Sequence, residues 1–207
     1  MKNSLERLAD RSTLQLVCIF VVLDAIALLC AWLFTIDVLE SRFFKLGRDR
    51  GIGELFEYGK FALIIYMLLH AWRETGHPVI RAWVILFCIM LADNLIGIHE
   101  EVGELIVNSV DLPDLGLKRP KDLAEIIVLA LLEGTALLYV GWCYLQSNMA
   151  GRQFSHGLMA IIAVFIFFAL GMDAVGPQLL EEPGEMLGMT LIMAWLHKGY
   201  RASTTAT

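Results

Sequence analysis

The class of this protein is set by one stretch, TLQLVCIFVVLDAIALLCAWLFT, at residues 13–35. It runs for 23 residues, and Asp24 is its single charged side chain. An apolar run of about 20 residues is long enough to cross a bilayer as one helix. The run is too long for the apolar region of a signal peptide and lacks an A-x-A-like end, so we expect it to stay in the protein as a first span.

The composition extends this interpretation to the whole chain of 207 residues. Hydrophobic residues make up 57 % of it and charged residues only 18 %, whereas soluble domains have a charged fraction of about 25 %. The net charge of −6 does not favour nucleic-acid binding. We expect an all-α, polytopic integral membrane helix bundle, one domain over residues 1–207, with six transmembrane helices. The expected spans cover approximately residues 13–35, 55–72, 82–104, 122–146, 156–175 and 182–198.

The second and sixth of these spans are weaker than the other four, because each has acids in its first turn. Both nevertheless end in the same kind of sequence, His-Ala-Trp-Arg at residues 70–73 and Trp-Leu-His-Lys at residues 195–198. Aromatic and basic residues of this kind typically anchor helix ends at the membrane surface. We therefore count both segments as spans, which places the two termini on the same side.

Charge is distributed unequally between the two sides of this topology. Lys and Arg are tied at eight on each side, but sixteen of the 22 acids lie opposite the termini, on what we call the acidic face. The tie means that the positive-inside rule does not fix the orientation. Because the first helix often sets it and basic residues outnumber acids beside the termini, we expect both termini in the cytoplasm of a bacterial cell, with the protein in the inner membrane.

The acidic face carries a weak internal repeat. DNLIGIHEEVGE at residues 93–104 resembles DAVGPQLLEEPGE at residues 173–185, with one inserted residue. Each copy has an aspartate at membrane depth followed by Glu-Glu-x-Gly-Glu. Repeats in membrane proteins tend to place the functional site at their interface, so we interpret the copies as two halves of one site, with Asp93 and Asp173 as a deeper pair.

Acids also recur three residues apart at the ends of several helices, a spacing that puts two carboxylates on one helix face. So many like charges need a counter-charge, because each would otherwise raise the pKa of the next. A divalent cation supplies it, and an oxygen-rich set with one imidazole favours Mn, Fe, Ca or Mg over zinc. The candidate metal ligands are Glu57, Asp93, His99, Glu100, Glu101, Glu104, Glu133, Asp173, Glu181, Glu182 and Glu185.

Asp24 stands alone in its span, and for this residue we favour a structural role, hydrogen-bonded to a neighbouring helix. Lys60 is counted among the basic residues near the acidic face. The four cysteines lie inside apolar runs without metal-ligand spacing, and we interpret them as core residues.

Three functions explain this pattern. The first is metal-ion binding or transport at the acidic face. The second is a carboxylate-bridged two-metal enzyme acting on a lipid-soluble substrate, although the Glu-x-x-His motifs of such sites are replaced here by Glu-x-x-Glu. The third is a non-catalytic subunit of a larger membrane complex. The expected partners are membrane lipid, a divalent cation, and either a second copy of the chain or other subunits; no catalytic residue is assigned.

Overall fold

The computed structural model of the protein describes residues 2–45, 50–113, 116–117, 119–172 and 178–204, and in this part of the chain all regular structure is helical. A short 3-10 turn, Arg42–Phe44, follows the first helix, and a π-helical segment, Phe167–Met172, extends the sixth. The α-helices are α1 (Lys2–Thr35), α2 (Ile52–Thr75), α3 (Pro78–Ile96), α4 (Ile98–Ser109), α5 (Pro120–Gln146), α6 (Met149–Ile166) and α8 (Gln178–Thr204).

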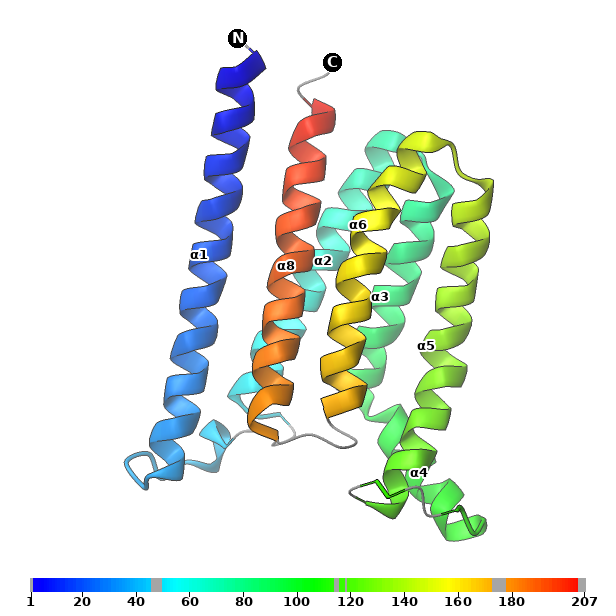
Figure 1. Ribbon diagram of the computed structural model, residues 1–207. Coiled ribbons are helices and arrows are strands. Elements are labelled where there is room, and N and C mark those ends of the chain that lie inside the picture. Colours follow the sequence, from blue (N-terminus) through cyan, green and yellow to red (C-terminus); the bar gives the residue numbers. More distant parts are fainter. Residues whose placement is uncertain (1, 46–49, 114–115, 118, 173–177, 205–207) are drawn as a thin grey trace.

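The long helices stand side by side in one bundle (Figure 1). α1 packs on α8, α8 packs on α2 and α6, and α3 lies between α2 and α5. The short helix α4 packs against α5 at the lower end of the bundle in Figure 1, while α1 begins and α8 ends at the upper end. The expected acids at helix ends therefore gather at the end of the bundle away from the termini.

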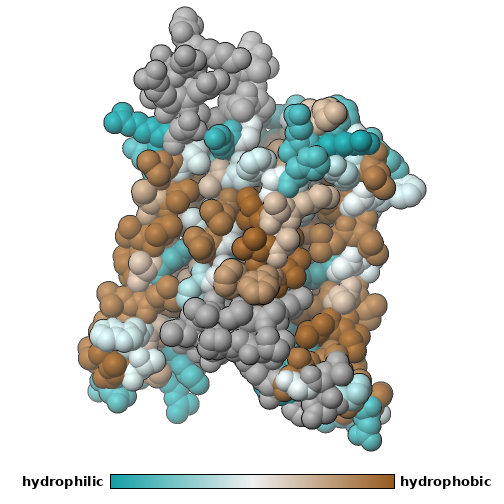
Figure 2. All heavy atoms as spheres, viewed as in Figure 1, coloured by the Kyte–Doolittle hydropathy of each residue, from teal (hydrophilic) through white to brown (hydrophobic). Residues whose placement is uncertain are grey.

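Four helical segments are long and apolar enough to cross a membrane: Arg11–Thr35, Pro78–Ile96, Lys121–Gln146 and Met149–Ala169. They coincide with the four strong spans expected from the sequence, so the prediction of a helical multi-pass membrane protein is confirmed at this level. On the face seen in Figure 2, hydrophobic side chains form a broad middle band and hydrophilic ones collect at both ends. This is the surface that a bilayer would cover.

The bundle interior is packed by large apolar side chains, chiefly from α2 and α3. Phe61, Ile64 and Leu68 of α2 are buried, as are Trp83 and Phe87 of α3. The indole N–H of Trp83 donates to the Ser155 hydroxyl of α6 over 3.0 Å, which satisfies the one polar group that this ring brings into the core.

The third expected span, residues 82–104, is wrong as one continuous helix. The chain leaves helical geometry at Gly97, whose φ of 73° is left-handed and favours glycine, and α4 starts afresh at Ile98. Asp93 and Glu100 therefore do not share one helix stripe as an unbroken span would require. The membrane-spanning part of this segment ends at Ile96.

Candidate functional site

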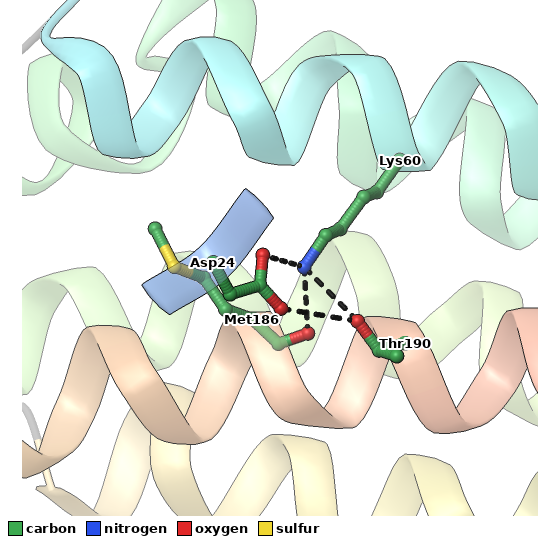
Figure 3. Close-up of polar contacts among 4 residues, drawn as sticks. All are labelled: Asp24, Lys60, Met186 and Thr190. Atoms are coloured by element: carbon green, nitrogen blue, oxygen red, sulfur yellow. Dashed lines mark hydrogen bonds and ion pairs between the residues drawn. The ribbon is translucent and has the colours of Figure 1, made fainter. Parts of the chain in front are cut away.

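A buried ammonium lies in the interior of the bundle, that of Lys60 on α2, whose residue is 1 % exposed. Its Nζ donates to Asp24 Oδ1 of α1 over 2.6 Å, to the Met186 carbonyl of α8 over 2.9 Å, and to Thr190 Oγ1 of α8 over 3.1 Å. Figure 3 shows the Lys60 side chain reaching from its own helix toward these oxygens. We call this set of four residues the Lys60 node.

The hydrogen bonds of the Lys60 node form a closed set. An ammonium has three N–H donors, and each one meets an oxygen of another helix. The second carboxylate oxygen of Asp24 accepts from the Thr190 hydroxyl over 3.2 Å. A buried ion pair is tolerated when hydrogen bonds satisfy its remaining donors and lone pairs, and this arrangement meets that condition across α1, α2 and α8.

The node corrects one prediction and adds two residues that sequence reasoning missed. Lys60 was expected near the acidic face, whereas it lies in the bundle interior beside Asp24. Asp24 itself behaves as expected, as a carboxylate hydrogen-bonded to neighbouring helices. Thr190 and the Met186 carbonyl carry no sequence signal of their own; the only available clue was that a charge inside a span needs a partner.

One helical turn before Lys60, a group of carboxylates from two helices comes together. Glu57 of α2 is 6 % exposed, hydrogen-bonds the side chain of Glu185 and lies within electrostatic range of Glu182, both on α8. We call these three residues the α2–α8 carboxylate group. Gly53 makes room for it, because a Cβ there would stand 2.9 Å from Glu182 Oε2.

A narrow hollow lies between α1, α2 and α8. It is lined by Ala27, Ala31, Gly53, Glu182 and Met186, among others, and has no room for a water molecule. Glu182 belongs to the carboxylate group and Met186 belongs to the node. Both polar sites therefore border the same hollow.

A separate polar group forms where α3 meets α4. Asp93, which is fully buried, accepts from the backbone N–H of His99 over 3.0 Å and lies 2.7 Å from His99 Nδ1 through its other oxygen. Asp93 thus caps the first turn of α4 and orients the imidazole. Glu133 of α5 lies within electrostatic range of both residues. These three residues are the Asp93–His99 group.

His99 lies on α4, beyond the end of the membrane-spanning part of α3. Burial lowers the pKa of His99, but the hydrogen bond and charge of Asp93, with the charges of Glu100 and Glu125, outweigh it. The pKa of His99 is therefore raised above its ordinary value near 6.5. Because Nδ1 faces Asp93, Nε2 is directed away from this carboxylate.

The structure thus divides the predicted metal ligands between two groups. Glu57, Glu182 and Glu185 meet in one, and Asp93, His99 and Glu133 in the other. Within the described residues, no three His, Cys, Asp or Glu side chains converge closely enough to hold a metal ion in this conformation.

The remaining predicted ligands do not join either group as buried members. Glu100, Glu101 and Glu104 are exposed on α4. Asp173 and the side chain of Glu181 lie outside the described residues, so the pairing of Asp93 with Asp173 stays a prediction.

Comparison with known proteins identifies a family for this chain. A family model described as Domain of unknown function (DUF8692) matches residues 12–198. The chain belongs to this family. No curated protein and no solved structure gave a match. The matched region runs from the start of the first apolar span to Lys198 in α8 and so contains all three polar groups.

Proposed function

We propose that this protein binds and transports a divalent cation, Mn, Fe, Ca or Mg, through the α2–α8 carboxylate group at its acidic face. The observation that carries the proposal is the meeting of Glu57 with Glu182 and Glu185, which come from helices far apart in the sequence. One buried and two partly buried acids in one place need positive charge. Carboxylate oxygens are the ligands that these cations prefer.

The hydrogen bond between Glu57 and Glu185 suggests how a cation would enter. Two carboxyl groups form such a bond only when one of them carries a proton. A divalent cation would displace this proton and supply the charge that holds both oxygens.

The proposal includes six transmembrane helices, with α2 and α8 as the two additional spans. At about 1.5 Å per residue, the 24 residues of α2 and the 27 of α8 are longer than the roughly 30 Å hydrocarbon core. The charge of Lys60 is compatible with α2 as a span, because it is paired inside the bundle and does not face lipid. The packing of α2 and α8 against the apolar spans also supports it.

We place both termini in the cytoplasm of a bacterial inner membrane, with the acidic face outside. Cysteine labelling tests the topology in a background without the four native cysteines. We expect Ser203→Cys and Ser109→Cys to react with an impermeant reagent from opposite sides. Reaction of both cysteines from the same side would rule out the six-helix topology.

Metal binding to the purified, chelator-treated protein tests the site. We expect Mn²⁺ to raise the melting temperature of the wild-type protein, because a ligand that binds the native state stabilises it. Glu185→Gln should weaken this effect by at least tenfold in apparent affinity. Glu40→Gln is the matched control, since Glu40 is an exposed acid outside the group. Equal Mn²⁺ affinity in both variants would exclude the carboxylate group as the site.

One observation favours the two-metal enzyme as a second candidate. Metal-ligating histidines are usually oriented by a carboxylate on their other nitrogen, and Asp93 holds His99 in this way. Two tightly bound iron ions per chain in protein purified without chelator would favour the enzyme. Weak, exchangeable metal would favour transport, and no metal would favour the role of a non-catalytic subunit in a larger membrane complex.

A further inference from the structure

We propose that the oxygens of the Lys60 node form a second, deeper site for a monovalent cation of potassium or ammonium size, which Lys60 fills in this conformation. The inference uses Glu57 of the α2–α8 carboxylate group but does not require that this group binds a divalent cation. The proposed ligands are Asp24 Oδ1, Thr190 Oγ1 and the Met186 carbonyl, the three oxygens that surround Nζ.

The geometry of the cage points to a cation of this kind. One carboxylate, one hydroxyl and one backbone carbonyl form a ligand set of hard oxygens with a single negative charge. Oxygens of these types replace the hydration shell of alkali ions in channels and transporters. The ammonium at the centre already shows that a compact monovalent cation is accommodated, with oxygen distances of 2.6, 2.9 and 3.1 Å.

For another cation to enter, Lys60 must leave the cage while keeping its proton. Glu57 offers an alternative partner, because it lies one turn earlier on α2, is buried, and interacts electrostatically with Lys60. With Lys60 paired to Glu57 and the incoming cation paired to Asp24, both positive charges remain compensated inside the bundle. Without this move, two cations would share one carboxylate.

The cage is buried in this conformation. A hollow beside it, lined by Gly53, Glu182 and Met186 among others, is too narrow to hold a water molecule. In the other direction, apolar side chains that are essentially fully buried follow on α2 and α8, including Ile64 and Met193. Entry of a cation therefore requires a local opening, and the side of the hollow, where Glu182 lies, is the polar one.

A purely structural ion pair makes a different prediction from a cation site, and Lys60→Ala separates the two. This variant leaves the three oxygens and removes the resident ammonium. We expect its melting temperature in KCl or NH₄Cl to exceed that in choline chloride of equal ionic strength by about 2–4 °C, saturating with concentration. Choline is the control because it is a monovalent cation too large for the cage.

Two further variants make the result specific. Adding Asp24→Asn to Lys60→Ala should abolish the potassium response, because the charged ligand is lost. Lys60→Met, which refills the space with an uncharged chain of similar length, should show a smaller response than Lys60→Ala. Equal melting temperatures of folded Lys60→Ala protein in KCl and choline chloride would overturn the proposal.

A measurement on the unmodified cage covers the case in which Lys60→Ala fails to fold. We expect saturable binding of radioactive rubidium to the wild-type protein, reduced at least fivefold in Glu57→Gln, in which Lys60 has lost its alternative partner. Absence of saturable rubidium binding to the wild type would refute the site. Glu185→Gln should lose Mn²⁺ binding but keep rubidium binding, so failure of either proposal can be recognised separately.

Discussion

The Lys60 node and the Asp93–His99 group compensate the charge of a buried aspartate in two different ways. Each contains a buried aspartate paired with a basic residue. In the node, three long helices supply partners for every donor of the ammonium. In the Asp93–His99 group, the aspartate caps a helix and holds one ring nitrogen, while the imidazole is 21 % exposed. In this conformation the closed network of the node joins three helices, whereas the partly open Asp93–His99 group leaves one edge of the imidazole accessible.

From this comparison, the largest effect of a substitution on stability is expected at Asp24. Asp24→Ala would leave the Lys60 ammonium buried without its counter-charge, which costs about 3–5 kcal/mol. Replacing both partners, as in Asp24→Leu with Lys60→Met, should recover much of this loss because no unpaired charge remains. Chemical unfolding in detergent measures both variants. A loss below about 1 kcal/mol for Asp24→Ala would mean that the pair behaves like an exposed one.

A smaller effect is expected at Asp93. Asp93→Ala removes the acceptor for the His99 backbone N–H and the partner of its ring, with a cost of about 1–3 kcal/mol. Because the lost bonds are local to the start of α4, hydrogen exchange should quicken there and stay unchanged in α2. Uniformly faster exchange throughout the bundle would show that Asp93 supports the whole fold, as the node does.

The Asp93–His99 group should also give the protein a pH dependence. The pKa of His99 is raised in the folded state, so its protonated form is favoured by folding. The stabilisation is fully present below its unfolded pKa of about 6.5 and is lost as pH rises through the folded value. The stability difference between wild type and His99→Gln should therefore shrink as the pH rises above about 6.5. A difference that grows with pH would reverse the assigned direction.

The smallest effects concern two glycines of α2 that differ in their surroundings. A Cβ at Gly59 meets nothing within 4 Å, so Gly59→Ala should stabilise the helix by up to about 1 kcal/mol. Gly53→Ala would press on the flexible end of Glu182, so the same gain should be partly or wholly offset. The clearer effect of Gly53→Ala should be weaker Mn²⁺ binding, measured beside Gly59→Ala as the control. Equal Mn²⁺ affinity of the two variants would exclude Glu182 from the site.

Part of the candidate site could be predicted from residue spacing, and part could not. The bundle brings Glu57 together with Glu182 and Glu185, all three of which the acid pattern selected. The expected span over residues 82–104 would put Asp93 and Glu100 on one helix stripe, and this was wrong because Gly97 ends the helix between them. An isolated glycine within an apolar run is tolerated in many helices, so its left-handed φ depends on how α4 packs against α5.

The sequence by itself determined that this chain forms membrane-spanning helices, because uninterrupted apolar runs of sufficient length have one stable arrangement in a bilayer. It also determined that Asp24 needs a partner, because a lone charge in such a run is costly. Only the tertiary structure decided that the partner is Lys60, held with Thr190 and the Met186 carbonyl. These residues lie on three helices whose packing order depends on the shapes of many side chains together, and local sequence patterns do not encode that order.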